Sequence, residues 1–163
     1  MPGIVRTYAP CGQTPILRRF ETRDHLSVMS GVTMTGRLYT MVREQAFTSA
    51  DSVFFISHLL RFFEKVMVIW DRSPIHKGEV REYLSNGAAR KVRLEQLPPY
   101  APELNPDEGV WQHLKHVEMR NLCCSNLIDL RQELHFAIMR LRSKPYLIES
   151  FFAGAHLSTV VKF

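Results

Sequence analysis

The spacing of apolar positions changes several times along the chain, and each change marks an expected element. Residues 25–34 and 37–44 alternate apolar and polar positions, and the Thr35-Gly36 pair between them is typical of a tight turn. These two segments predict a β-hairpin. Residues 1–25 carry prolines and glycines at short intervals, which predicts a loop.

A helical spacing follows the hairpin. Thr48 and Asp51 stand three positions apart at the start of residues 48–65, which is the pattern of a capping box. The apolar residues after them recur at the spacing of one helical face. They are Phe55, Leu59, Phe62 and Phe63. The segment therefore predicts an amphipathic helix.

A short and fully apolar run comes next, at residues 66–70. Such a run is typical of a strand that is buried on both faces of a sheet. A helix should follow this strand, because Ser73 is a good N-cap, Pro74 suits the first helical position, and Asn86-Gly87 suits the helix end.

The remaining chain predicts one more strand and two helices. Residues 91–97 alternate as a strand does, and residues 106–120 and 127–142 have helical spacing. The apolar positions in register along the second helix are Leu127, Leu130, Leu134, Ile138 and Leu141. Pro145 is expected to stop this helix before a short apolar tail at residues 146–152. The order β-β-α-β-α-β-α-α indicates an α/β layer structure with a mixed sheet.

Length and charge narrow the picture. A chain of 163 residues is the size of one domain, so residues 1–163 are predicted to form a single domain. The net charge of +5 and the pI of about 9.3 favour an anionic partner, most often nucleic acid, although many soluble domains carry this charge without one.

Cysteine usage and the lack of long apolar runs point to a reducing, aqueous compartment. Cys11, Cys123 and Cys124 are odd in number and lack CxxC spacing, so they predict neither a disulfide framework nor a zinc site. No apolar run has the length of a membrane span or a signal core. We therefore expect no membrane association and a cytoplasmic location.

Asp71 directly follows the apolar strand. Side chains just past the carboxyl ends of such strands point into the crevice where α/β proteins bind ligands. Asp71 could instead start the turn or cap the next helix. Ser73-Pro74 already supplies a cap and a first helical residue, so we expect a functional role for Asp71.

The stretch LPPYAPELNPDEGVW, residues 97–111, leads into a helix through a rigid loop. Asn105 is a strong N-cap, Pro106 falls at the first helical position, and Glu108 falls at the third, where a capping-box glutamate would also stand. The prolines before them hold the loop in one path, which suits precise placement of Glu108. Four residues are expected to pack this helix onto the sheet: Val110, Trp111, Leu114 and Val117.

Two carboxylates on neighbouring elements can jointly hold a divalent metal. Mg²⁺ binds through one or two carboxylates plus phosphate oxygens, and two such ions can clamp an in-line phosphoryl displacement. Asp71 and Glu108 are the candidates, and a third carboxylate is usually needed. His113 and His116 lack partners with zinc spacing, so we expect them to be solvated.

Several basic residues could contact phosphates or simply form solvated faces. They are Arg18, Arg19, Arg90, Lys91, Lys115 and Arg120.

These motifs resemble those of the mariner-superfamily transposases, especially the bacterial insertion-sequence 630 type. The segments that carry the resemblance are VIWDRSPIH and LPPYAPELNPDEGVWQHLK, with RTYAPCGQTP and LIESFF as weaker matches. The resemblance implies a ribonuclease-H-like fold, with a mixed sheet flanked by helices and a DDE triad. By position, Asp71 would be the second triad acid and Glu108 the third, and both would bind Mg²⁺ or Mn²⁺. Supporting positions of the family pattern fall on His76, Asn105, Trp111 and Lys115, and Arg72 stands where asparagine is usual.

One part of the family pattern has no counterpart here. The first catalytic Asp of the family lies on a central strand upstream of the segment matched by RTYAPCGQTP, and residues 1–6 contain no acid. Glu21 and Asp24 lie on the other side of that segment and do not substitute for it. The resemblance therefore implies the C-terminal portion of a catalytic domain, without its first strand and without a helix-turn-helix DNA-binding domain.

The implied function is DNA transposition by metal-dependent strand cleavage and strand transfer, inactive in this isolated chain. The implied partners are DNA at transposon ends and targets, an upstream chain supplying the first Asp, and further copies in a homo-oligomer, with the protein associated with the nucleoid. The alternative is a non-catalytic module that binds DNA or a transposase. An unrelated nucleotide-binding protein is disfavoured because no glycine-rich phosphate loop follows a strand.

Overall fold

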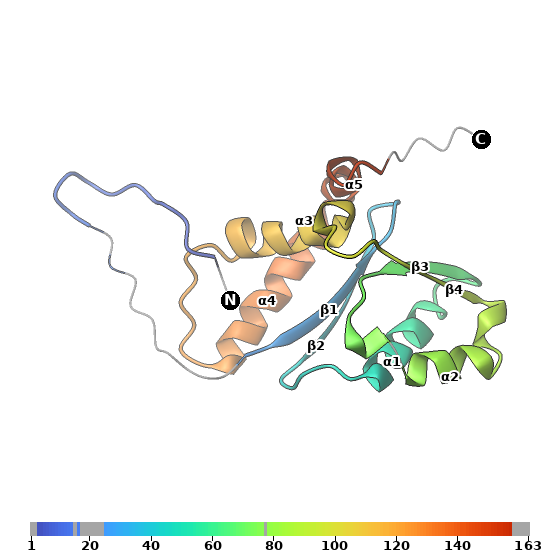
Figure 1. Cartoon of the computed structure of the whole chain (residues 1–163). Coiled ribbons are helices and arrows are strands. Elements are labelled where there is room, and N and C mark those ends of the chain that lie inside the picture. The colour runs from blue at the N-terminus through green and yellow to red at the C-terminus, as the bar shows by residue number, and fades with distance from the viewer. Residues whose placement is uncertain (1–2, 15, 17–24, 77, 158–163) are drawn as a thin grey trace. The chain divides into compact units, whose positions relative to one another are not determined.

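Strands and helices follow one another in the order that the sequence predicts, with one further helix, α5, after the predicted ones. The computed structural model describes residues 3–14, 16, 25–76 and 78–157 (Figure 1). The elements are β1 (Ser27–Val32), β2 (Leu38–Arg43), α1 (Ser49–Leu59), β3 (Val66–Trp70), α2 (Glu79–Ser85), β4 (Val92–Gln96), α3 (Pro106–His113), a π-helical turn (Leu114–Glu118), α4 (Leu127–Arg142) and α5 (Pro145–Gly154), with short 3₁₀ turns at Pro74–His76, Ala88–Arg90 and Pro102–Leu104.

Contacts divide the chain into two compact units. Unit 1 comprises Met1–Glu44 and Pro106–Phe163, and unit 2 comprises Gln45–Asn105. Each unit has one two-stranded sheet: among the described residues, β1 pairs only with β2 and β3 pairs only with β4. The strand pairs agree with an α/β architecture, and the prediction of a single domain over residues 1–163 stays a prediction.

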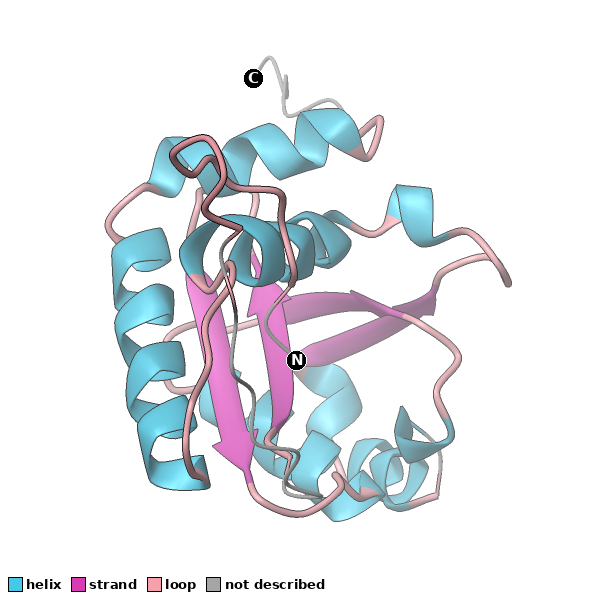
Figure 2. Cartoon of the chain, turned by 90° about the vertical axis from the view of Figure 1, so that its left-hand side faces the viewer, coloured by secondary structure: helices cyan, strands magenta, loops and turns pink. Residues whose placement is uncertain are grey.

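Unit 1 is built around the predicted hairpin. Strands β1 and β2 are antiparallel, and Val32 pairs with Leu38 next to the turn. The turn uses Gly36 at a φ of +72°, a conformation that favours glycine, so Thr35-Gly36 works as the sequence suggests. Figure 2 shows α4 running alongside these strands, and Arg142 of α4 donates a hydrogen bond of 3.0 Å to the backbone oxygen of Leu38.

The core of unit 1 joins the hairpin to α3, α4 and α5. Its buried members are Leu38, Val110, Leu114, Met119, Leu134, Ala137, Ile138, Leu141 and Ile148. Helix α4 has the bounds that the sequence predicts, and three of its five predicted apolar positions, Leu134, Ile138 and Leu141, are buried, while Leu127 and Leu130 are partly buried. The helix ends before Pro145, as predicted, but the apolar tail that follows forms a further helix: Pro145 begins α5, since proline is well tolerated in the first turn of a helix.

Unit 2 packs two helices against one face of a parallel strand pair. Strands β3 and β4 run in register from Val66 opposite Val92 to Trp70 opposite Gln96. Ile56 of α1, Val80 of α2 and Val92 of β4 form its buried cluster.

The expectation that β3 is buried on both faces is wrong. Met67 is 60% exposed and Ile69 is 56% exposed. The reason is the alternation of the strand: Val66, Val68 and Trp70 face the side that α1 and α2 cover, and the two exposed residues face the other side.

Helix α1 starts as predicted and ends early. The capping box is present, with Thr48 accepting from the backbone of Asp51 and Asp51 accepting from the backbone of Thr48. The helix ends at Leu59, where tighter backbone bonds close the last turn, so the predicted extension to residue 65 is wrong. Phe62 therefore lies beyond the helix and is 54% exposed.

The helix expected after β3 is split in two. A 3₁₀ turn covers Pro74–His76, and α2 begins only after Gly78. Gly78 has φ +63° and ψ −111°, which is not helical, so one continuous helix cannot run through it. The predicted end is correct, because Asn86 caps α2 and Gly87 adopts a left-handed conformation.

Two sequence expectations concern the remaining segments. The described residues before the hairpin, 3–14, 16 and 25, contain no helix or strand, as predicted, whereas Arg18, Arg19, Glu21 and Asp24 lie outside the described residues. None of the helices in the described part of the chain is both long and apolar enough to cross a membrane.

Candidate functional site

Asp71 sits at the carboxyl end of β3, in unit 2. Its side chain is 63% exposed. One carboxylate oxygen, Oδ1, accepts a hydrogen bond of 2.9 Å from the backbone N–H of Ser73. Asp71 therefore does start the turn that leads to Ser73, as the alternative interpretation of the sequence had it and as aspartate often does.

His76 supports this turn from beneath. Its Nδ1 atom lies 3.1 Å from Oδ1 of Asp71 and 3.1 Å from the backbone oxygen of the same residue. The imidazole stacks on the indole of Trp70, with ring centroids 4.1 Å apart and planes within 5° of parallel. Trp70 in turn accepts a backbone hydrogen bond of 2.8 Å from Leu97, just past β4. The end of β3 is thus fixed on three sides while Oδ2 of Asp71 makes no hydrogen bond within the described residues.

Glu108 occupies the first turn of α3, in unit 1. Its side chain is exposed and has no hydrogen bond or ion pair in the part of the chain that the structure describes. The backbone N–H of Asn105 donates to the oxygen of Pro102 at 3.0 Å. The alternative of a capping-box glutamate therefore does not hold, because the N–H that Glu108 would accept is already bonded to a carbonyl.

Asp107, next to Glu108, points the other way. Its Oδ2 accepts a hydrogen bond of 2.6 Å from the hydroxyl of Ser30 on β1 and one of 3.0 Å from the indole N–H of Trp111. Burial raises the pKa of Asp107 above its ordinary value, against the two hydrogen bonds, and the charge of Glu108 adds to the rise. This bridge ties α3 to the hairpin.

Apolar contacts fix α3 on its inner side. Val110 is fully buried and Leu114 is 2% exposed. Gly109 lies against the ring of Phe151 on α5, so closely that an added Cβ would stand 2.7 Å from a ring carbon. Two of the four predicted packing residues are thus buried and Trp111 is half-buried, but Val117 is 51% exposed because it lies in the π-helical turn. The packing leaves Glu108 on the outer face.

Lys115 lies in the π-helical turn that follows α3, seven residues after Glu108, and its side chain is exposed. Its backbone oxygen accepts a hydrogen bond of 2.8 Å from Gly3. Lys115 can therefore offer a positive charge to an anion that approaches this turn.

Glu118, at the end of the π-helical turn after α3, is the centre of a second charged group, which the sequence analysis did not identify. Glu118 has a side chain only 7% exposed, and it lies 2.6 Å from Arg140, 3.2 Å from Lys144 and 3.3 Å from His113. Burial acts to raise the pKa of Glu118, but the hydrogen bonds from these three residues outweigh it and hold the pKa below its ordinary value. The expectation of a solvated His113 is wrong, whereas His116 is exposed as predicted.

The candidate residues fall into two groups. Asp71, His76 and Asn105 belong to unit 2, and Glu108, Trp111 and Lys115 belong to unit 1. Trp111 acts by holding Asp107, and Asn105 lies half-buried at the entry to α3. Within the described ranges no three His, Cys, Asp or Glu side chains come together as a metal site.

The Ser30–Asp107 link had no signal in the sequence, since the two residues are 77 positions apart. The Asp107–Trp111 contact could have been found, because positions four apart meet on one helical face.

A family model described as DDE superfamily endonuclease matches residues 4–131. The chain belongs to this family. The matched range includes both Asp71 and Glu108. None of the curated proteins matches this family member.

Solved structures of the Mos1 transposase have a similar fold. The Mos1 mariner paired-end complex with Mn is 17% identical with a TM-score of 0.61, over 95% of this chain and 52% of that chain. The Mos1 strand transfer complex is 16% identical with a TM-score of 0.60, over 94% of this chain and 50% of that chain. The pre-cleavage Mos1 transpososome is 14% identical with a TM-score of 0.60, over 94% of this chain and 52% of that chain.

The likeness establishes the fold of this endonuclease-family chain. It confirms the predicted mixed α/β class and its similarity to a transposase catalytic domain of ribonuclease-H-like type. The chain spans about half the length of these Mos1 chains.

Proposed function

We propose that this chain is part of the catalytic domain of a DDE transposase, and that Asp71 and Glu108 hold the divalent metal with which such an enzyme cuts and joins DNA. The family match covers both acids. Similar structures are named as transposase complexes with transposon ends and after strand transfer, which supports DNA as the partner.

The donor chemistry fits a hard divalent cation. Glu108 has both carboxylate oxygens free of hydrogen bonds within the described residues, and Asp71 uses only Oδ1. Mg²⁺ and Mn²⁺ bind oxygen ligands, commonly one or two carboxylates with the rest from water and phosphate. When bound, such an ion polarises a phosphodiester and activates water. The similar Mos1 structure with Mn supports Mn²⁺ as an alternative to Mg²⁺.

The side chains around each acid orient it. The Trp70–His76 stack and the Ser73 hydrogen bond fix the backbone at Asp71. The Asp107 bridge to Ser30 and the Gly109 contact with Phe151 fix the first turn of α3, so Glu108 starts from a defined position. Pre-ordered ligands lose less conformational freedom when a metal binds. Lys115, in the π-helical turn after α3, would offer its positive charge to a phosphate of the DNA.

The first acid of the triad has no counterpart at the positions that match the family pattern. We propose that an upstream segment, on the same polypeptide or on a separate chain, supplies this acid and the strand that carries it. The complete enzyme would then act on transposon ends and target DNA as a homo-oligomer, at the nucleoid.

The single observation that carries the metal assignment is the state of Glu108. Glu108 is an exposed carboxylate at the start of a helix whose other side is fixed by a bridge and a close glycine contact, and it has no partner among the described residues of its own unit. A ligand role accounts for such a carboxylate.

The experiment is titration calorimetry of the purified chain with Mn²⁺. We expect the wild-type chain to bind Mn²⁺ and both Asp71→Asn and Glu108→Gln to weaken binding at least about tenfold, since each removes a charged ligand. Glu103→Gln is the matched control, because Glu103 is an exposed carboxylate in the same loop region and should leave binding unchanged.

Absence of any Mn²⁺ binding, or equal weakening by Glu103→Gln, would overturn the proposed site. The chain would then be a non-catalytic module that binds DNA or a transposase. If Mn²⁺ binds, the next step is to add the upstream segment and assay cleavage of transposon-end DNA.

A further inference from the structure

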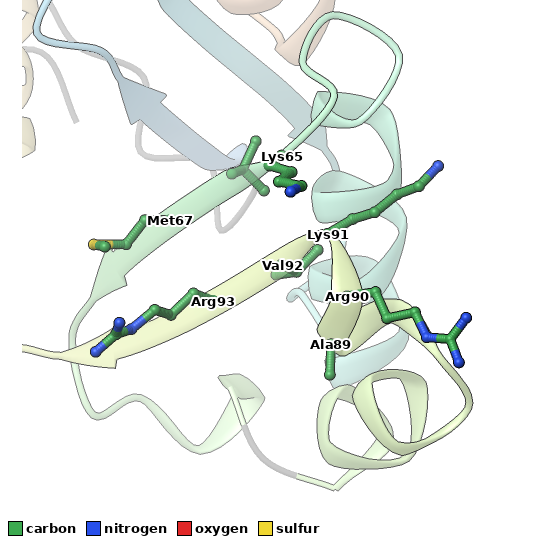
Figure 3. A pocket seen from close by; sticks show the side chains of 8 residues that line it. Lys65, Met67, Ala89, Arg90, Lys91, Val92 and Arg93 are labelled. Atoms are coloured by element: carbon green, nitrogen blue, oxygen red, sulfur yellow. The ribbon is translucent and has the colours of Figure 1, made fainter.

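The amino ends of β3 and β4 border an open hollow in unit 2. It has a volume of about 240 Å³ and is lined by Lys65, Val66, Met67, Ala89, Arg90, Lys91, Val92 and Arg93 (Figure 3). Four of these eight residues are cationic and none is acidic. The remaining four are apolar. A hollow of this composition fits an anion that also carries an apolar part.

Three of the four cations have no protein partner among the described residues. Arg93 lies 2.8 Å from Glu95, and this exposed pair neutralises it in part. Lys65, Arg90 and Lys91 have exposed side chains with no hydrogen bond or ion pair in the part of the chain that the structure describes. In Figure 3 the Arg90 and Lys91 side chains extend outward on one side of the hollow, and Arg93 extends along the other side with Met67. The positive charge therefore spreads across the hollow instead of converging on one point.

The backbone that presents these cations is pinned. The N–H of Val66 donates to the oxygen of Lys91 at 2.8 Å, which joins the starts of the two strands. The N–H of Lys91 donates to the oxygen of Ala88 at 2.9 Å and closes the 3₁₀ turn at Ala88–Arg90. The Cα positions of Lys65, Arg90 and Lys91 are thus held in a fixed relation. A spread row of charges on a rigid backbone suits a polymer of anions better than a single small anion.

The hollow lies at the opposite end of β3 from Asp71. Five residue steps separate Lys65 from Trp70, which is roughly 16 Å at the rise of a β-strand. That span is about five base-pair steps of B-DNA at 3.4 Å each. A duplex that presents a phosphate near Asp71 would therefore have further backbone phosphates within reach of this end of the unit. The alternation of phosphate and deoxyribose also matches a lining that mixes cationic and apolar side chains.

We propose that this basic hollow, defined by Lys65, Arg90, Lys91 and Arg93, binds backbone phosphates of duplex DNA without reading its sequence. The inference deepens the proposed function and rests on it for the identity of the polyanion. The hollow anchors the duplex away from the metal ligands, so that contacts with DNA outside the reacting phosphodiester hold the substrate in place.

The test is fluorescence anisotropy with a labelled 20-base-pair duplex of arbitrary sequence, in a metal chelator, over a series of salt concentrations. The double substitution Arg90→Gln with Lys91→Gln should weaken binding and reduce the slope of log K against log salt by about two, one for each phosphate contact removed. A second duplex of unrelated sequence should show the same change, because phosphate contacts carry no sequence information.

Arg61→Gln with Arg81→Gln is the matched control. Both arginines are exposed, both belong to unit 2 and neither lines the hollow, so the control removes the same charge elsewhere. A control that lowers the slope as much as the hollow variant would show that only net charge matters. Three outcomes would each overturn the proposal: an equal loss of slope in the control, an unchanged slope in the hollow variant, or no duplex binding by the wild-type protein.

The two proposals fail separately. The chelator removes the metal from the DNA-binding measurement, and the Mn²⁺ titration contains no DNA. Loss of the salt-slope effect therefore leaves Asp71 and Glu108 as metal ligands, and loss of Mn²⁺ binding leaves the phosphate contacts standing.

Discussion

In unit 1 the helix that carries Glu108 packs into a cluster of nine buried apolar residues, whereas the described residues of unit 2 place three in the cluster beside the strand that ends at Asp71. The two acids are positioned by correspondingly different means. Asp71 makes its own hydrogen bonds, to Ser73 and His76. Glu108 makes none in the described chain, and its neighbours Asp107 and Gly109 orient it. An acid that its neighbours hold in place keeps both carboxylate oxygens for a ligand. Substitution of the neighbours should then lower the stability of the protein more than substitution of the acid itself.

The strongest way to break this contrast is Gly109→Ala. The added Cβ would stand under 3.0 Å from three carbons of Phe151, and overpacking of this kind costs up to about 3 kcal/mol. Alanine recovers about 1 kcal/mol of helix propensity, so we expect a net loss of about 2 kcal/mol in the free energy of unfolding, measured by urea denaturation.

Gly154→Ala is the matched control for that substitution. Apart from its chain neighbours and the backbone of its own helix, no described atom lies within 4 Å of the Cβ it would add on α5, so we expect no loss and a small gain. Equal stability of the two variants would mean that Phe151 moves aside freely and that Gly109 does not fix α3.

Smaller effects on stability are expected at the two buried acids of unit 1, Glu118 and Asp107, and these effects should change with pH in opposite directions. Glu118 has a lowered pKa, so its stabilising contribution is present above the ordinary carboxyl pKa of about 4 and is lost as the pH falls through the folded value. Glu118→Gln should therefore cost most at neutral pH, about 1–2 kcal/mol, since Arg140 and Lys144 are partly exposed. The loss should shrink as the pH falls.

Asp107→Asn should show the opposite sign. The pKa of Asp107 is raised, so its stabilising contribution is complete below about pH 4 and is lost as the pH rises through the folded value. Asparagine does not ionise and can still bond Ser30 and Trp111. The variant should thus gain on the wild type as the pH rises, in urea midpoints taken at several pH values. If the stabilities of Glu118→Gln and Asp107→Asn relative to the wild type changed with pH in the same direction, the opposite pKa shifts of the two acids would be contradicted.

The smallest effects are expected at the candidate ligands themselves. Glu108→Gln removes no hydrogen bond or ion pair to a described residue, and Asp71→Asn keeps an oxygen for the Ser73 N–H while losing an exposed charge near His76. We expect both to lie within about 0.5 kcal/mol of the wild type, with Asp71→Asn the larger. A loss above about 1 kcal/mol for Glu108→Gln, in the same urea assay, would show that this carboxylate has a structural partner after all.

Local signals in the sequence predicted local structure well. Thr35-Gly36 indicated the hairpin because the turn needs a left-handed residue, and Thr48 with Asp51 indicated the start of α1 because a capping box is complete within four residues. The start of α5 at Pro145 was missed because proline can either end a helix or begin one, and only the surroundings decide.

Features that depend on distant residues could not be predicted in the same way. The exposed side of β3, seen at Met67 and Ile69, depends on which face the helices cover. The bridge from Ser30 to Asp107 joins a segment that precedes unit 2 in the sequence to one that follows it. At the candidate site the family pattern pointed to Asp71 and Glu108, but only the structure reveals that Glu108 is free of capping and that Asp71 forms a turn.

The chain passes from unit 1 into unit 2 after Glu44 and returns at Pro106, and this order has a consequence for biosynthesis. Unit 2 is one continuous segment, so it can fold as soon as it leaves the ribosome. The hairpin of unit 1 is made first but must wait for its partners: Arg142, which bonds to Leu38, comes 104 residues later. At about 5–20 residues per second, that wait is on the order of 5 to 20 seconds. During it the apolar side of β1 and β2 is open to aggregation or to a chaperone, and the first unit to be started is the last to be completed.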